Sequence, residues 1–175
     1  LRATVERKRE AANYRMFAVS KRSGGRRFIH AVTGELQIVQ RFINEDILQK
    51  CRVHPASYAF HPSGGIRKCA AQHCGAKWLF QFDLSDFFYA VTEAKAFRVF
   101  QDMGYRDLLA FELARLCSTT RLPRNKSMYL KPRNSRTRFP SVRIGSATEV
   151  FPYPQNSGYL GVLPQGAPTS PMLSN

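Results

Sequence analysis

Two aspartates, Asp83 and Asp86, interrupt the apolar run "FQFDLSDFFYAV". Burying a carboxylate beside phenylalanines is costly unless a cation or hydrogen bonds compensate it. Mg²⁺ is an efficient compensation, because it commonly takes one or two protein carboxylates together with substrate phosphates. On this chemistry Asp83, inside the apolar run, is a candidate metal ligand, with a solvent-facing cap as the open alternative. For Asp86 the cap of a helix or turn is the favoured interpretation.

A second group of candidates surrounds a glycine turn. The stretch "SKRSGGRRF" places Lys21, Arg22, Arg26 and Arg27 on both sides of two glycines. Arginine can bind phosphate through two parallel hydrogen bonds, so this arrangement suits a clamp on phosphates. A solvated basic turn is the alternative.

A third candidate is the peptide "LPQGAPTSPMLSN". Pro164 and Pro168 stiffen it, and Gly166 permits the close approach of a backbone or a base. Gln165 offers both donors and an acceptor. An ordinary turn from a strand into a helix is the alternative.

The composition points to a polyanionic partner. The 175 residues include 27 Lys and Arg against 12 Asp and Glu, a net charge of +15, and 43% are hydrophobic. This excess exceeds what solubility requires in a small domain, so nucleic acid is the expected partner. We expect no membrane partner, since no apolar run approaches the roughly 20 residues that span a bilayer.

The cysteines do not indicate a metal site. Cys69 and Cys74 are separated by four residues with His73 between them, a spacing that differs from the usual zinc knuckle, and no second pair follows. Reduced thiols and the absence of a signal-like start predict a cytoplasmic protein.

The elements expected to position these residues begin with a helix-prone lead-in at residues 1–13 and a β-hairpin at 14–32. Thr33 is the expected N-cap of a helix that carries apolar residues at helical spacing, and residues 66–73 form a short helix. The run "KWLFQFDLSDFF" predicts a buried strand that ends in a turn. The apolar positions of the helix that follows Thr33 are Leu36, Val39, Ile43 and Ile47.

Two further helices and a strand complete the expected order. The first covers residues 93–103 and stops at Gly104. Asp107 caps the second, which places Leu109, Leu113 and Leu116 on one face. "YLGVLPQG" predicts an apolar strand that leads into the third candidate peptide. Between them, residues 121–157 form a basic insertion whose template-binding candidates are Arg124, Lys126, Lys131 and Arg133.

The order of the motifs resembles that of the bacterial reverse transcriptases, especially their retron and defence-associated branch. The motifs are "YRMFAVSKRSGGRRFI", "LQIVQRFI", "ASYAF", "CAAQH", "FDLSDFF", "VFQDMGY" and "LPQGAPTSPMLSN". The resemblance covers residues 14–120 and 158–175. It implies an α+β right-hand polymerase with fingers at 14–78, the first part of the palm at 79–120, and the start of the LPQG segment at 158–175.

The resemblance also implies roles for individual residues. Asp83 matches the first metal ligand, with the Leu84 carbonyl beside it, and the cofactor is Mg²⁺, two ions in the complete enzyme, or Mn²⁺. Phe88 matches the aromatic gate that excludes a 2′-hydroxyl. Gln165 lies beside the incoming nucleotide, and Gly166 admits the template base. The dNTP-binding set is completed by Lys21, Arg26, Arg27, Asp86 and Phe87.

The sequence also departs from the family pattern. Cys69 stands where retron relatives usually have asparagine, and Tyr89 stands where they usually have proline. No Tyr-x-Asp-Asp motif occurs, so we expect the chain to be a fragment, truncated before that hairpin and the thumb, and inactive alone.

The expected function of the complete protein is RNA-directed DNA synthesis by two-metal phosphoryl transfer. The expected partners are template RNA, a DNA or RNA primer, dNTPs and a cognate noncoding RNA. The expected location is the bacterial cytoplasm. Antiviral defence is one of the biological roles that the sequence leaves open. The alternative is a catalytically silent module that binds RNA. An RNA-dependent RNA polymerase is disfavoured by Phe88.

Overall fold

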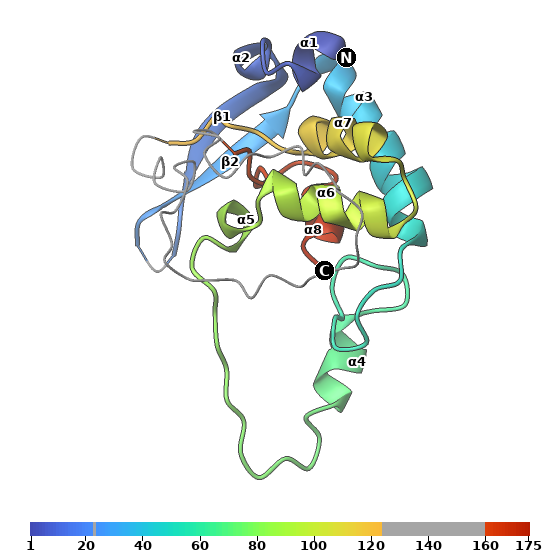
Figure 1. Cartoon of the computed structure of the whole chain (residues 1–175). Helices are drawn as coiled ribbons and strands as arrows, with labels where there is room; N and C mark the ends of the chain where they lie inside the picture. The colour runs from blue at the N-terminus through green and yellow to red at the C-terminus, as the bar shows by residue number, and fades with distance from the viewer. Residues whose placement is uncertain (23, 124–159) are drawn as a thin grey trace, which may run out of the picture.

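The structure is a computed structural model, and it describes residues 1–22, 24–123 and 160–175. This part of the chain mixes helices with one small antiparallel sheet, which agrees with the predicted α+β class. In Figure 1 the hairpin lies on one side of the helices α3, α5, α6, α7 and α8, and α4 lies apart from them. The elements in order are α1 (Arg2–Val5), α2 (Glu10–Asn13), β1 (Tyr14–Ser20), β2 (Arg26–Val32), α3 (Gly34–Phe42), the π-helix η1 (Ile43–Ile47), the 3₁₀ helix η2 (Leu48–Lys50), α4 (Ile66–Ala71), α5 (Phe87–Ala90), α6 (Glu93–Asp102), α7 (Asp107–Cys117) and α8 (Ser170–Leu173).

The predicted hairpin is confirmed. Strands β1 and β2 are antiparallel, with Tyr14 opposite Val32 at the base and Ser20 opposite Arg26 near the turn. Gly24 and Gly25 both have positive φ values, 86° and 81°, which glycine adopts without steric cost. The glycine turn therefore fixes the register of the basic residues on both strands.

The lead-in is divided into two short helices rather than one. Arg7 lies between α1 and α2 with φ 61°, a left-handed conformation that a continuous helix does not contain. This break turns the Arg7 side chain toward the later helices, where it is paired with Glu93. The helix-prone lead-in is therefore helical in two pieces, and a long-range contact determines the conformation between them.

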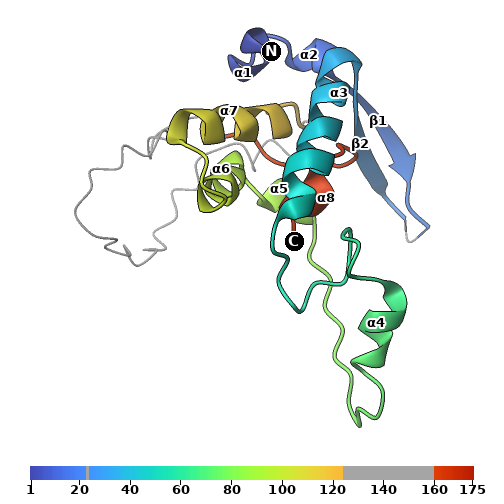
Figure 2. The same ribbon diagram turned by 90° about the vertical axis from the view of Figure 1, so that its right-hand side faces the viewer.

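Helix α3 begins after Thr33, as predicted, and continues without interruption into η1 and η2. The Thr33 hydroxyl donates to the carbonyl of Ala12 instead of capping its own helix. Figure 2 shows α3 crossing beside the hairpin, α6 and α7. Leu36 and Ile43 are buried, so the predicted apolar face is the one that meets the core.

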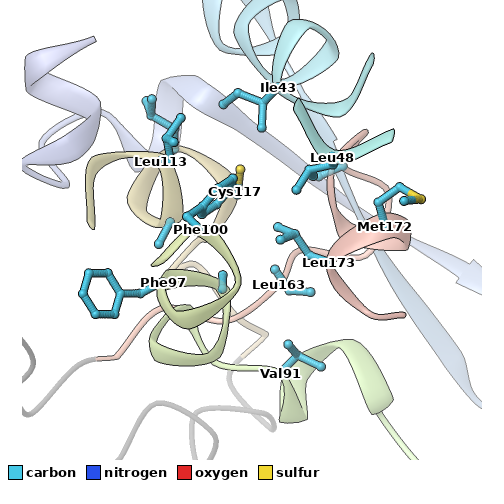
Figure 3. Close-up of a cluster of buried hydrophobic side chains, with 14 of the residues drawn as sticks. Ile43, Leu48, Val91, Phe97, Phe100, Leu113, Cys117, Leu163, Met172 and Leu173 are labelled. Atoms are coloured by element: carbon cyan, nitrogen blue, oxygen red, sulfur yellow. The ribbon is translucent and has the colours of Figure 1, made fainter. Parts of the chain in front are cut away.

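The hydrophobic core lies between the helices. Phe97 and Phe100 of α6 are completely buried, and α7 packs along α6. Figure 3 shows side chains of η1, α6, α7 and α8 meeting in this cluster, together with Leu163 from the third candidate peptide. Burial raises the pKa of the Cys117 thiol to about 12, which keeps it protonated.

The end of α6 agrees with the prediction, whereas the start of α7 differs from it in the residue that caps the helix. Gly104 has φ 90° just after α6, as expected of a helix stop. Asp107 is the first residue of α7, and Arg106 is its cap. Leu113 and Leu116 are buried, whereas Leu109 is 45% exposed and is not part of the core face.

The buried strand predicted at "KWLFQFDLSDFF" is wrong. Residues 78–84 have no strand structure, and Trp78 and Phe82 are 83% and 88% exposed. A strand needs a neighbouring backbone for its hydrogen bonds, and no strand of the described residues lies beside this segment. The strand predicted at "YLGVLPQG" is likewise reduced to isolated bridges, from Val162 to Thr92 and Thr119.

No helix in the described ranges combines the length and apolar character needed to cross a membrane.

Candidate functional site

The peptide that contains Gln165 is held by three separate parts of the chain. Val162 exchanges both backbone hydrogen bonds with Thr119, and the Leu163 amide donates to the Val91 carbonyl at 3.0 Å. The Gln165 carbonyl accepts a hydrogen bond of 2.7 Å from the amide of His30 on β2. The peptide therefore joins the basic hairpin to the segment that follows the Asp83 motif, as the path of the C-terminal chain in Figure 1 shows.

Gly166 is required by its contact with the hairpin. Its φ is 108°, a conformation that L residues rarely adopt. A Cβ atom here would lie 2.8 Å from Ile29 Cγ2 and 3.2 Å from the His30 carbonyl. The close approach of a backbone, one of the two interpretations of this glycine, is thus confirmed. Its contact with a template base stays a prediction.

The turn after Gly166 is closed by its own residues. The Pro164 carbonyl accepts hydrogen bonds from the Ala167 amide at 3.3 Å and from the Ser170 hydroxyl at 2.7 Å. Ser170 and Thr169 are fully buried. Neither contact uses the side chain of Gln165, a residue that is half-buried at the junction.

A buried ion cluster fixes the start of this peptide. The Glu93 carboxylate accepts a hydrogen bond of 2.9 Å from the Gly161 amide and one of 3.2 Å from the Ser118 hydroxyl. It is also paired with Arg7, and Arg115 Nε lies 3.0 Å from its other oxygen without the alignment of a hydrogen bond. The side chain of Glu93 is 1% exposed, so these contacts replace its lost hydration.

Arg7 extends the cluster to the N-terminal segment. Its guanidinium is 2.7 Å from Glu10 and donates to the Ser118 carbonyl at 2.5 Å. Burial opposes the charge of Arg7, but Glu93 and Glu10 outweigh it and raise its pKa. The sequence analysis missed this cluster, because Arg7 and Glu93 are far apart in the sequence and resemble ordinary surface charges.

The residues that follow Asp83 reach the hairpin through α5. Asp86 occupies the cap position of α5 with φ 53°, where the favoured interpretation put it, but its side chain makes no capping hydrogen bond; its carbonyl accepts from the Tyr89 amide. Phe88 packs partly buried against the core, with its ring centroid 6.0 Å from that of Phe87. Tyr89 is 5% exposed, and its hydroxyl lies 3.5 Å from the Phe28 carbonyl on β2.

The predicted phosphate-binding residues lie at the open end of the hairpin. Lys21, Arg26 and Arg27 are exposed, and the Lys21 amide donates to the Gly25 carbonyl across the turn. Their side chains thus face solvent. Arg26 and Arg27 lie on the same strand as His30, whose amide is bonded to Gln165, and Lys21 directly follows the partner strand β1.

Asp83 and Leu84 are not gathered into this junction. Both are exposed on the segment that leads into α5. Across the described ranges, no group of three or more His, Cys, Asp or Glu residues could hold a metal ion. One carboxylate and one carbonyl are fewer ligands than a magnesium pair needs. The described residues therefore do not form a complete two-metal site.

The basic residues predicted to bind template lie outside the described residues. They are Arg124, Lys126, Lys131 and Arg133.

Comparison with known proteins identifies the family. Residues 19–175 match the family "Reverse transcriptase (RNA-dependent DNA polymerase)". One relative is the retron Ec86 reverse transcriptase of Escherichia coli, which is 28% identical over 93% of this chain and 39% of its own length. Another is the retron Mx65 reverse transcriptase of Myxococcus xanthus, which is 33% identical over 98% of this chain and 35% of its own length. The chain thus spans less than half the length of these relatives. It belongs to the reverse transcriptase family, as its motifs predicted.

Proposed function

We propose that this chain, a member of the reverse transcriptase family, forms the fingers (residues 14–78) and the first part of the palm (79–120 and 158–175) of an RNA-directed DNA polymerase. The polymerase would add deoxynucleotides to a primer 3′-hydroxyl. The observation that carries the proposal is the position of the Gln165 peptide. It is bonded to the basic hairpin through His30 and to the segment after the Asp83 motif through Val91.

In this proposal the hairpin binds the triphosphate. Lys21, Arg26 and Arg27 are exposed, and no acid among the described residues forms an ion pair with them, so their charges are directed at solvent, where a polyanionic ligand can bind them. Arginine binds phosphate oxygens in pairs, and lysine acts as a point charge. The glycine turn allows the two strands to close over the ligand.

Phe88 and Gln165 select and orient the nucleotide. The core holds Phe88 in place, so its ring is a fixed steric barrier. A fixed aromatic ring excludes a 2′-hydroxyl from the space it occupies, which favours deoxynucleotides. The side-chain amide of Gln165 can both donate to and accept from a nucleotide. Its backbone carbonyl is already bonded to the His30 amide. Asp86 and Phe87 flank this position at the start of α5.

Asp83 would supply one carboxylate, and Leu84 its carbonyl, to the metal site. Mg²⁺, or Mn²⁺ in its place, would supply charge stabilisation for the attacking and leaving oxygens. Because the described residues do not complete the site, the remaining ligands would come from a part of the polymerase outside the described ranges.

The basic segment at 121–157 would bind template RNA through phosphates. The net charge of +15 supports a nucleic-acid partner, and contacts to phosphate do not depend on sequence. The two relatives described above are named as retron reverse transcriptases, which supports a cognate noncoding RNA as a further partner and a bacterial cytoplasmic location.

The test is Asp83→Asn in the complete polymerase, with Asp102→Asn as the control. Asp102 is also exposed and lies at the end of α6, away from the Gln165 peptide. We expect Asp83→Asn to abolish primer extension on an RNA template, and Asp102→Asn to preserve it. Extension by Asp83→Asn would refute the assignment. Salt-sensitive RNA binding without extension by the unmodified protein would identify a catalytically silent module instead.

A further inference from the structure

His30 lies where the hairpin, the Gln165 peptide and α5 meet. It is fully buried in the middle of β2 and opposite Met16 of β1. Its backbone amide points away from β1 and donates to the Gln165 carbonyl. None of the roles proposed above uses its imidazole.

The imidazole is held on three sides. Nε2 lies 2.8 Å from the carbonyl of Arg121, which can only accept, so Nε2 must carry the proton. The rings of Tyr14 and Tyr89 pack edge-on against it, with centroid distances of 6.5 and 5.9 Å. The other nitrogen, Nδ1, is buried and has no hydrogen-bond partner among the described residues. Within this part of the chain the site therefore fits a neutral imidazole in one tautomer and provides no acceptor for a second proton.

Two of the three neighbours of the imidazole, Tyr89 and Arg121, belong to elements of the candidate site. Tyr89 follows Phe88 directly in α5, and the Tyr89 hydroxyl approaches the Phe28 carbonyl of β2. Arg121 is the first residue of the basic segment, and its guanidinium donates to the Tyr14 carbonyl at 2.5 Å. A substitution of His30 would thus alter the packing next to Phe88, to the Gln165 peptide and to Arg121 at the same time.

We propose that His30 is a positioning residue of the nucleotide site: its neutral imidazole holds α5 and Arg121 against β2, and its backbone amide holds the Gln165 peptide on the same strand, in the arrangement that binds the incoming dNTP. The role rests on the proposed polymerase function. Protonation of Nδ1 would bury an N–H group that has no acceptor among the described residues. The free energy of this desolvation exceeds what the positive charge gains from its surroundings. The arrangement is therefore expected to loosen at acidic pH.

The groups around His30 support this direction. Burial lowers its pKa, while its hydrogen bond with Arg121 and the charge of Glu10 on α2 oppose the shift, and the charge of Arg121 adds to it. Burial raises the pKa of Tyr14 and raises that of Tyr89 to about 12, so both rings stay neutral. Since the folded pKa lies below the ordinary value, stability is lost as the pH falls from about 6.5 toward the folded pKa.

The first experiment compares two substitutions of His30 in the complete polymerase. His30→Gln places an amide N–H near the position of Nε2 and cannot titrate, whereas His30→Leu removes the donor. We expect His30→Leu to raise KM for dNTP about tenfold at pH 8 and His30→Gln to stay within about twofold of the unmodified enzyme. Below pH 6.5, KM should rise for the unmodified enzyme and stay flatter for His30→Gln.

Gln40→Leu is the matched control. Gln40 is also fully buried, and its Nε2 donates to the Leu116 carbonyl at 2.7 Å and to the Tyr14 hydroxyl at 3.0 Å. Its loss should lower the melting temperature and the amount of active enzyme without raising KM for dNTP. An unchanged KM in His30→Leu, or equal pH dependence in His30→Gln and the unmodified enzyme, would overturn the inference.

A second measurement does not depend on activity. In NMR spectra of the chain, the His30 imidazole should titrate below its ordinary range as the Nε2–H tautomer, and the signals of Gly166 and Tyr89 should shift with it. These shifts should be absent in His30→Gln. If they occur but the complete polymerase does not extend a primer, the proposed function fails while the coupling stands. If Gly166 and Tyr89 do not respond, the inference fails whether or not the enzyme is active.

Discussion

Replacing Glu93 by glutamine tests the buried cluster that anchors the start of the Gln165 peptide. The substitution keeps the shape of the side chain and an acceptor for the Gly161 amide, but it removes the charge that Arg7 and Arg115 face. Removing one partner of a buried ion pair costs about 3–5 kcal/mol, because the other charge stays buried without compensation. Since the acceptor is retained and Arg7 keeps its ion pair with Glu10, we expect a loss near the lower end, about 3 kcal/mol.

This loss is large compared with the stability of a domain, which is about 5–15 kcal/mol. For a chain of this length it corresponds to a decrease in melting temperature of about 6–12 °C. Urea unfolding followed by circular dichroism measures the free energy of unfolding directly. The control is Glu6→Gln, which removes an exposed carboxylate that contacts only Arg2 and Lys8 within the described residues. We expect it to unfold like the unmodified protein.

A double-mutant cycle with Arg7→Leu separates the pair from the general effect of each substitution. Arg7 and Glu93 are in direct contact, so the double variant should be more stable than the sum of the two single losses predicts. A loss below about 0.5 kcal/mol for Glu93→Gln, the usual range of a surface substitution, would show that the cluster is solvated. Additive losses in the cycle would refute the direct pairing.

Two further substitutions test residues of the candidate site. Gly166→Ala should destabilise the chain by about 1–3 kcal/mol in urea unfolding, because its φ of 108° is strained for alanine and the new methyl group would lie 2.8 Å from Ile29 Cγ2; equal stability would mean that the peptide does not pack on β2. Phe88→Val should raise ribonucleotide use relative to deoxynucleotide use by at least about tenfold, measured as the ratio of the two kcat/KM values in the complete polymerase. An unchanged ratio would contradict the gate assignment.

Local patterns predicted the elements whose conformation depends on near neighbours. The hairpin is indicated by alternating apolar residues around Gly24 and Gly25, and both glycines have the positive φ that the turn needs. The helix after Thr33 is indicated by its apolar period, and its buried residues are those of the predicted face. In both cases the information lies within a few residues of the element itself.

The exposed segment 78–84 shows why apolar character alone did not predict its structure. Trp78 and Phe82 belong to an apolar run that resembles a core strand, yet both are exposed. Burial depends on a covering element, and the described residues contain no strand that pairs with this one. Exposed apolar patches of this kind mark contact surfaces. Under the proposed function, the covering element would belong to a part of the polymerase outside the described residues.

The candidate site was predictable only in part, for a related reason. Gln165 and Gly166 could be recognised from their own peptide, because proline and glycine restrict the backbone there. Glu93 and His30 could not, since their importance arises from partners that the fold brings from distant parts of the sequence. A glutamate in the first turn of a helix, and a histidine in a strand, are each common without such partners.

In the Gln165 peptide, the backbone makes the structural contacts and the side chain is left for the proposed ligand binding. Its backbone carries the structure: the Gln165 carbonyl accepts from His30, and the Leu163 amide donates to Val91. Gly166 provides the space for β2, which any side chain at that position would occupy. Because the packing uses the backbone and the glycine, the side chain of Gln165 is not needed to hold the peptide in place. A polar side chain on a rigidly held backbone is a suitable ligand-binding group, since little of its binding free energy is spent on ordering the chain.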